Sequence, residues 1–571
     1  MQSYRLLSSK LERLHEYDGV LFGLLPFEPD QFSSNNRLIG GMPGTGKTLQ
    51  FCMIMQSQLP WPRAQPRPGG RHQGLRVRGV MDGAPSQGLR RRVYQSIVYD
   101  AKSQQVARLM THGFTPGLDL FVLNPLDTSG MVWDIASDIT EHVHAQEFAS
   151  SLVSNVVLPH NLSSASDHFY KTARAVVTDV VQVLQRTRHW RLRDLINCLK
   201  TRERIEEVTR LHPEGPGGRS QHHLNKTDES ESTLSTLAEH VNQFALVAAC
   251  WDAIERVHGK GRMLSLNKWV RDGGGTVLVL PDGDEHPTIT KPFNRFIMQR
   301  LKYLMMKPDQ LNRGLHRTIF IDELPTAGKI DCLVELLNKG RDYGLSVTLG
   351  IQDIHQMYAV YGREVTEAIV NACGYKAWMK CLGSMAEFAS QQIGRQMIEY
   401  QAPNTGFSRS RSDGQSQSYK EQSKVWLDSY NDSSSQNLGF STVRGEQHAF
   451  MPAYFTQMPD IHSTGKVPGV YSAPNGRIWS INIPLDLILH GILRDTYLQE
   501  KHHHAAAAVD EITGGDQVLA PLTIEDCRRL QIPPSIAGAE DLGSADDPPP
   551  RDAPQRPRKS AKKKRPPDSF F

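Results

Sequence analysis

Short apolar runs alternate with longer stretches of mixed polarity along much of the chain. Two runs lie near the beginning, at 96–100 and 118–124, and the second half holds four more, at 276–280, 318–322, 346–351 and 375–379. Apolar runs of this length, separated by helical patterns, are typical of buried strands in a parallel sheet. The sequence therefore predicts an α/β fold in which a mostly parallel sheet is flanked by helices.

The middle of the chain has a different periodicity. From 141 to about 257 the apolar positions recur at helical spacing, for example at Phe169, Ala173, Val176, Val180 and Leu184. Residues 212–230 are polar and Gly-rich, which predicts a loop between two helices. We expect an all-α domain in this part of the chain.

Three other segments lack the pattern of a packed core. Residues 61–92 form an insertion rich in Arg, Pro and Gly, and 404–442 is a low-complexity Ser/Gln/Asn tract that we interpret as a loop. Residues 470–472 and 478–481 flank Pro474-Asn475-Gly476, which predicts a hairpin. Residues 486–571 are expected to be a mostly disordered tail that ends in a basic run at 556–565.

Composition excludes several classes of protein. The 571 residues are 39% hydrophobic and 22% charged, which is ordinary for a soluble globular protein of two or three domains. The seven cysteines are scattered without a CxxC pair, so a disulfide framework or a zinc ribbon is not indicated, and buried thiols are the simplest interpretation. The sequence has neither about 18 consecutive apolar residues nor a signal-peptide pattern, which predicts a cytoplasmic protein.

The candidate chemistry begins with an octapeptide, GMPGTGKT, at 41–48. Glycines let successive backbone N–H groups curl round a phosphate, Lys47 supplies a positive charge, and Thr48 offers a hydroxyl to Mg²⁺. A plausible strand precedes the loop and a plausible helix follows it, as a phosphate-binding loop requires. The predicted nucleotide-binding residues are Gly41, Gly44, Thr45, Gly46, Lys47 and Thr48.

The apolar run at 318–321 leads into Asp322 and Glu323, the natural second half of such a site. We expect Asp322 to hold Mg²⁺ with Thr48, and Glu323 to polarise the attacking water. Gln352 ends the next predicted strand and would sense the γ-phosphate, although an exposed glutamine is the alternative.

Asp100 and Lys102 follow another predicted strand, and the carboxyl ends of parallel strands meet at one edge of a sheet. Two interpretations stay open for them. They either contact nucleotide or cap the helix that follows.

Five stretches, in this order, resemble the conjugative coupling proteins of type IV secretion systems, the TraD/TraG-type DNA-pumping ATPases. They are LIGGMPGTGKT, IVYDAKSQQV with NPLDTSGMVWDIASDI, the helical block, TIFIDELPTAGKIDCLVELLNKGRDYGLSVTLGIQDIHQMYAVYG, and NACGYKAWMK with EFASQQIGRQ. The resemblance covers roughly 15–485 and implies a RecA-like P-loop NTPase core. The domains would be a first motor part at 1–140, an inserted all-α domain at 141–265, a second motor part at 266–485, and the tail at 486–571.

The resemblance also implies an ATP- and Mg²⁺-dependent, DNA-stimulated ATPase that works as a homo-hexamer. A neighbouring subunit of such a ring often contributes an arginine to the γ-phosphate, and Arg341 or Arg395 would supply it here, an ordinary salt bridge being the alternative for each. The implied partners are DNA, a relaxase or relaxosome, and type IV secretion components at the inner membrane. The basic segments predict sequence-independent DNA contact, since no base-reading motif is visible.

Many relatives begin with transmembrane helices that this sequence lacks. We therefore expect a cytoplasmic protein that reaches the inner membrane peripherally, through partners. The predicted function is a coupling protein that pumps a relaxase–DNA substrate toward the secretion machine. A soluble FtsK/HerA-like DNA pump or helicase, and an ATP-binding receptor for secreted proteins, are the alternatives.

Overall fold

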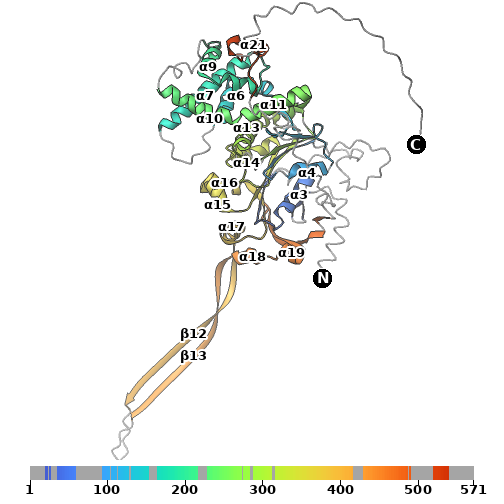
Figure 1. Cartoon of the computed structure of the whole chain (residues 1–571). Helices are drawn as coiled ribbons and strands as arrows, with labels where there is room; N and C mark the ends of the chain where they lie inside the picture. Colours follow the sequence, from blue (N-terminus) through green and yellow to red (C-terminus); the bar gives the residue numbers. More distant parts are fainter. Residues whose placement is uncertain are drawn as a thin grey trace, which may run out of the picture.

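Figure 1 shows the whole chain as a computed structural model. The residues that the structure describes are 20–22, 25–27, 35–58, 93–102, 104–111, 113–127, 130–153, 164–215, 228–272, 274–282, 287–311, 315–415, 428–486, 488–489 and 519–538. The predicted insertion at 61–92 and the basic run at 556–565 lie outside these residues.

The centre of the molecule is a nine-stranded sheet. Seven neighbouring strands, from β11 to β5, are parallel, and β14 and β15 extend one edge in antiparallel order. Across the sheet the strands are β15 (Ile478–Pro484), β14 (Lys466–Ser472), β11 (Cys373–Trp378), β3 (Asn36–Gly40), β10 (Leu345–Ile351), β9 (Leu315–Ile321), β4 (Val93–Asp100), β8 (Val277–Pro281) and β5 (Leu120–Val122). The predicted α/β class is confirmed.

The inner strands are apolar because helices cover both faces of the sheet. Every residue of β3, β8 and β10 is buried, as expected for a parallel sheet packed on both sides. Helices α3 (Lys47–Gln58) and α4 (Gln105–Thr111) pack on one face. The other face is covered by α13 (Pro287–Met305), α14 (Leu333–Lys339), α15 (Ile354–Tyr361), α16 (Arg363–Asn371) and α17 (Gly383–Ile393).

A helical unit, residues 142–258, occupies the end of the molecule near α11 in Figure 1. Its helices are α6 (His142–Leu152), α7 (Ser164–Gln185), α8 (Leu192–Cys198), α9 (Arg202–Thr209), α10 (Asp228–Gln243) and α11 (Ala245–His258). The chain enters through β6 (Val132–Trp133) and leaves through β7 (Met263–Leu264), and these two strands pair in parallel. The all-α prediction for this part of the chain therefore agrees with its secondary structure.

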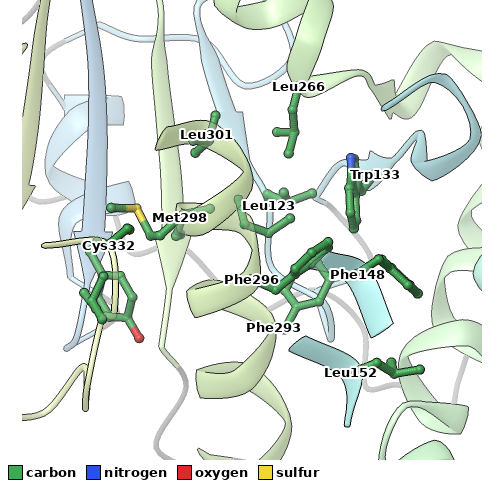
Figure 2. Close-up of a cluster of buried hydrophobic side chains, with 14 of the residues drawn as sticks. Leu123, Trp133, Phe148, Leu152, Leu266, Phe293, Phe296, Met298, Leu301 and Cys332 are labelled. Atoms are coloured by element: carbon green, nitrogen blue, oxygen red, sulfur yellow. The ribbon is translucent and has the colours of Figure 1, made fainter. Parts of the chain in front are cut away.

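The helical unit and the sheet share one apolar core. Figure 2 shows Phe293 and Phe296 of α13 beside Trp133 and Phe148. The ring centroids of Phe296 lie 5.0 Å from Trp133 and 5.1 Å from Phe148. Aromatic pairs at this separation add to the stability given by area burial, so the contact holds the two parts together.

Asp138 ties the entering and leaving chains together. Its carboxylate accepts hydrogen bonds from Trp133 Nε1 at 2.6 Å and from the backbone N–H of Leu266 and Asn267 at 2.7 and 2.9 Å. The two backbone donors belong to the first turn of α12 (Leu266–Asp272), which the carboxylate caps.

The prediction of a loop at 404–442 is wrong for most of that tract. Strands β12 (Arg395–Gln415) and β13 (Asp428–His448) pair antiparallel from Arg395↔His448 to Gln415↔Asp428. They form the long arm that extends away from the body in Figure 1. The backbone ladder supplies this pairing, so the apolar alternation on which the sequence prediction relied is not needed. The hairpin predicted around Asn475 is confirmed as β14 and β15.

The prediction of a mostly disordered tail also needs correction, at 519–538. This segment contains α21 (Ile524–Leu530) and a 3₁₀ turn at Pro534–Ile536, and it packs on the helical unit. Leu522, Cys527 and Ile536 are fully buried. A capping box between Thr523 and Asp526 starts the helix, a signal that was present in the sequence but surrounded by Ala, His and Pro runs.

Two composition-based expectations can be compared with the structure. All seven cysteines are free and buried, which confirms them as packed thiols. Among the described residues, no helix combines the length and the apolar character that crossing a membrane requires.

Candidate functional site

The GMPGTGKT loop connects the end of β3 to the start of α3. Gly44 and Gly46 have φ angles of +76° and +91°, which residues with a Cβ rarely adopt. Thr45 Oγ1 donates to Met42 O at 2.7 Å, and Met42 N donates to Lys380 O at 3.1 Å. The loop is thereby fixed against the end of β11, with the first turn of α3 directly behind it.

Close packing explains two of the glycines. A Cβ on Gly46 would lie 2.4 Å from Val467 Cγ1 of β14, so a larger residue cannot fit there without a shift. A Cβ on Gly350 in β10 would lie 1.9 Å from Asp322 O. This gap lets Leu324 N donate to Gly350 O at 2.9 Å and fixes the chain just beyond β9. Both halves of the predicted site therefore depend on backbone contacts.

The register places the predicted residues at one edge of the sheet. Ile351 pairs with Gly40, and Leu349 pairs with Ile321, so β3, β9 and β10 end at the same level. Lys47, Asp322, Glu323 and Gln352 follow these strand ends, as the sequence predicted. The structure brings three of them into direct contact.

Glu323 is the common partner. Its Oε2 accepts a hydrogen bond from Lys47 Nζ at 2.7 Å and another from Gln352 Nε2. The Lys47 and Glu323 side chains are each only 4% exposed, so the ion pair lies in a low-dielectric environment and is strong. Gln352 is therefore not the exposed side chain of the alternative interpretation.

The electrostatics of Lys47 follow from its burial. Desolvation lowers the pKa of Lys47 below its ordinary value, while Glu323 and then Asp322 counteract that effect. The positive charge of Lys102 lowers the pKa further. Lys47 is thus a buried cation whose charge depends on nearby anions, as expected of a phosphate ligand.

The carboxylates also suit a divalent cation. Asp322 and Glu323 are each 3% exposed, and among the described residues Asp322 Oδ1 and Glu323 Oε1 have no hydrogen-bond partner. A buried carboxylate oxygen without a donor is costly, and a hard cation such as Mg²⁺ takes oxygen ligands of this kind. The half-buried Thr48, second residue of α3, is the hydroxyl expected to accompany Asp322. The residues present fit nucleotide with Mg²⁺.

Asp100 caps a helix. It is 1% exposed, and its carboxylate accepts the backbone N–H groups of Lys102, Gln104 and Gln105 at 3.3, 3.1 and 2.7 Å. Burial raises the pKa of Asp100, and these N–H groups counteract part of the rise. Of the two interpretations left open, capping accounts for the side chain. Lys102 is exposed beside it.

The two candidate arginines lie away from this cluster. Arg341 is in the 3₁₀ turn Gly340–Tyr343 that precedes β10, whereas Gln352 follows β10. A seven-residue strand spans about 20 Å, so Arg341 cannot reach Lys47 of its own chain. Arg395 starts the arm, is 62% exposed and lies 3.6 Å from Glu446. Either arginine could act only on a neighbouring subunit.

Sequence reasoning missed the residues that support the loop from the side. The backbone of Lys380, just beyond β11, and Val467 of β14 both contact it. The first could have been found, because 375–379 was predicted as a strand of the same sheet and its end must lie at the same edge. The second could not, since nothing in the sequence reveals that β14 packs beside Gly46.

A family model for the type IV secretion-system coupling protein DNA-binding domain matches residues 20–468. The coupling protein TraD of Escherichia coli (strain K12) is 21% identical over 306 residues. That match takes in 52% of this chain and 39% of TraD, so the chain spans about two fifths of the relative's length.

Solved structures of the bacterial conjugative coupling protein TrwB resemble the fold. An unbound form of TrwBdeltaN70 has a TM-score of 0.54 at 17% identity, with 84% of this chain and 91% of that chain covered. TrwB in complex with ADP and Mg²⁺ gives 0.54 at 16% identity, covering 88% and 94%. TrwB with a non-hydrolysable ATP analogue gives 0.55 at 16%, covering 84% and 92%. At these identities the likeness establishes the fold, which agrees with the RecA-like prediction.

Proposed function

The chain belongs to the type IV secretion-system coupling protein family, and we propose that it is an ATP-driven DNA translocase of that family. Its task would be to recruit a relaxase–DNA substrate and pump the DNA toward a type IV secretion machine. The observation that carries the proposal is the buried cluster of Lys47, Glu323 and Gln352 at the edge where the phosphate-binding loop begins.

Each side chain of the cluster has a role in ATP hydrolysis. Lys47 and the loop N–H groups would bind the β- and γ-phosphates, and Thr48 with Asp322 would hold Mg²⁺. Bound Mg²⁺ neutralises charge on the phosphates. Glu323 would orient a water and accept its proton, and Gln352 fixes that carboxylate by donating to it. The bound nucleotide and Mg²⁺ in TrwB support this assignment.

DNA enters the proposal through the family and the charge distribution. The matching model describes a DNA-binding domain, and residues 556–565 carry seven Lys and Arg without an acid. Such a run neutralises phosphates without reading sequence. A homo-hexamer would supply a channel and would place Arg341 or Arg395 of one subunit near the nucleotide of the next. Relaxase and inner-membrane secretion components complete the proposed partners.

The test is ATP turnover at low salt with no DNA, with single-stranded DNA and with duplex DNA. Wild type is compared with Lys47→Ala, and Lys339→Ala serves as the control because it removes the same charge from an exposed site. We expect DNA to raise wild-type and Lys339→Ala turnover, and Lys47→Ala to lose at least 100-fold.

The outcomes separate the alternatives. Active Lys47→Ala would show that the site is assigned wrongly. Turnover that DNA leaves unchanged would reject the DNA pump and favour an ATP-binding receptor for protein cargo. DNA-stimulated turnover without binding to a purified relaxase would favour a soluble pump or helicase of the FtsK/HerA kind.

A further inference from the structure

Residues 519–538, here called the clasp, pack on the helical unit although the nearest preceding described residue is 489. In Figure 1 its helix α21 lies beside α9, at the opposite end of the molecule from the arm. Leu522, Cys527 and Ile536 are 0% exposed and Leu530 is 1% exposed. Burying four such side chains contributes about 1.5–3 kcal/mol each for the larger ones, so the contact is a stable one.

Buried charges fix the position of the clasp. Arg529 donates to both carboxylate oxygens of Asp194 at 3.0 Å each, and Asp194 in α8 is 0% exposed. Arg193 donates to Asp526 at 2.9 Å and to the backbone oxygens of Ala520 and Pro521 at 3.1 and 2.5 Å. Bidentate arginine–carboxylate pairs are directional, so the segment has one orientation on the helical unit.

The charges of Asp526 confirm how tight this network is. Burial acts to raise the pKa of Asp526, but Arg529, the Thr523 backbone and Arg193 outweigh it and hold the pKa at about 2. The carboxylate therefore stays ionised, and the clasp stays paired, throughout the neutral range.

The basic run begins at Arg556, only 18 positions after Gly538. Eighteen residues span at most about 60 Å, so the clasp confines seven cations to the neighbourhood of the helical unit. Counted from residue 489 instead, the same run is 67 positions away and could reach more than about 200 Å. The clasp also borders the turn after α7, where Arg186 and Arg188 are exposed and Arg529 donates to His189 O.

We propose that the clasp is an anchor that holds the basic end of the chain at the helical unit, where it binds the backbone of DNA. The proposal rests on the function above, since DNA is the partner in both. The clasp itself contacts no DNA. Its effect is on local concentration, which falls roughly as the −3/2 power of tether length, so an 18-residue tether exceeds a 67-residue one by about sevenfold.

The experiment changes the tether and leaves the clasp intact. A Gly/Ser segment of about 50 residues is inserted between Gly538 and Ala539, and in the matched control the same segment is appended after Phe571. Binding of a fluorescent duplex to the full-length protein is measured at low salt without ATP. We expect the insertion to weaken binding about fivefold to tenfold and the C-terminal extension to leave it unchanged.

A second variant, Leu522→Asp with Ile536→Asp, releases the clasp itself. It is compared in the full chain and in a chain truncated after Gly538. We expect weaker DNA binding in the full chain and no further loss in the truncated one, since the basic run is then already gone. Truncation should also flatten the dependence of log K on log salt, by up to about six for seven phosphate contacts.

Two results would overturn the anchor: an insertion that leaves binding unchanged, or a clasp release that weakens binding equally in the truncated chain. The second would mean that the clasp only stabilises the helical unit. DNA-stimulated ATP turnover is recorded in parallel. If binding responds as expected while DNA leaves turnover unaltered, the anchor stands and the proposed function fails.

Discussion

Lys47 Nζ lies 2.7 Å from Glu323 Oε2, although 276 positions separate the two residues in the chain. The helical unit is inserted between them, so this ion pair joins the two halves of the candidate site. Gln352, from a third strand, donates to the same Oε2. Glu323 is thus held by donors on either side of β10, and its Oε1 is left for another ligand.

Glu323→Gln tests the role of that carboxylate. Glutamine keeps the shape but cannot accept a proton, so we expect turnover to fall about 10²- to 10⁴-fold. Nucleotide affinity should change less than tenfold, because Lys47 and the loop remain. Steady-state turnover and binding of a fluorescent ATP analogue measure the two effects. Turnover within threefold of wild type would remove Glu323 from the reaction.

Gly46→Ala tests the contact between the loop and β14. Alanine at φ +91° is strained by about 1–2 kcal/mol, and its Cβ would lie 2.4 Å from Val467 Cγ1. We expect nucleotide affinity to drop at least tenfold. Gly44→Ala is the control, since its φ is +76° but nothing lies within 4 Å of the added Cβ.

The pair Gly46→Ala with Val467→Ala separates strain from collision. Removing Val467 Cγ1 relieves the contact and leaves the backbone strain, so the double variant should recover to the level of Gly44→Ala. Nucleotide titration of all four proteins measures this. No recovery would mean that backbone strain alone accounts for the loss.

Asp100→Ala distinguishes a cap from a nucleotide ligand. The change removes an acceptor from three backbone N–H groups, and we expect the free energy of unfolding to fall by about 2 kcal/mol. The rate per folded molecule should stay within twofold. Chemical denaturation and turnover on the same samples give both numbers. A tenfold loss of turnover at unchanged stability would restore the nucleotide interpretation.

Much of this architecture was accessible from the sequence, because buried parallel strands are continuous apolar runs. The residues after each run, such as Asp322 and Gln352, could then be placed at one edge by the geometry of a parallel sheet alone. Whether Gln352 points into the site was not accessible, since the exposed alternative has the same sequence. Its hydrogen bond to Glu323 depends on the register of β9 and β10.

Two failures have a common cause. The arm at 395–448 and the clasp at 519–538 lie in polar or low-complexity surroundings, where hydrophobic periodicity gives no signal. The arm is held by a backbone ladder that any residue except proline can join. The clasp depends on Arg529 meeting Asp194, two residues 335 positions apart, and only the folded chain brings them together.

His144 predicts a specific pH dependence of stability. Its side chain is 2% exposed, and burial, reinforced by Arg300 and Lys307 against Glu141, lowers its pKa from 6.5 to about 4. The unfolded chain therefore binds the proton first. Stability is complete above pH 6.5 and declines as the pH falls toward 4, by about 2 kcal/mol between pH 7 and pH 5.

His144→Gln, which cannot be protonated, should show a smaller loss by about that amount. Urea unfolding at pH 7 and at pH 5, followed by tryptophan fluorescence, measures the difference for both proteins. Glu335, an exposed acid paired with Lys302 and Lys339, offers the control variant Glu335→Gln. Equal losses in wild type and His144→Gln would assign the acid sensitivity to other groups.

Arg341 provides a test of cooperation between subunits. It lies at the amino end of β10, about 20 Å along the strand from Gln352, so any contribution to hydrolysis must come from a neighbouring subunit. Arg341→Ala should then abolish turnover by at least 10³-fold, the usual effect of such an arginine, while nucleotide binding to each chain is retained. Mixing inactive Arg341→Ala with inactive Lys47→Ala should restore measurable turnover. In a mixed ring some sites have Lys47 from one variant and Arg341 from the other. Arg395→Ala, mixed in the same way, is the matched comparison, and restoration by only one of the two identifies the arginine that acts. Unmixed Arg341→Ala with wild-type turnover would exclude it, and mixtures of either variant that stay inactive would mean that the site is completed within one chain.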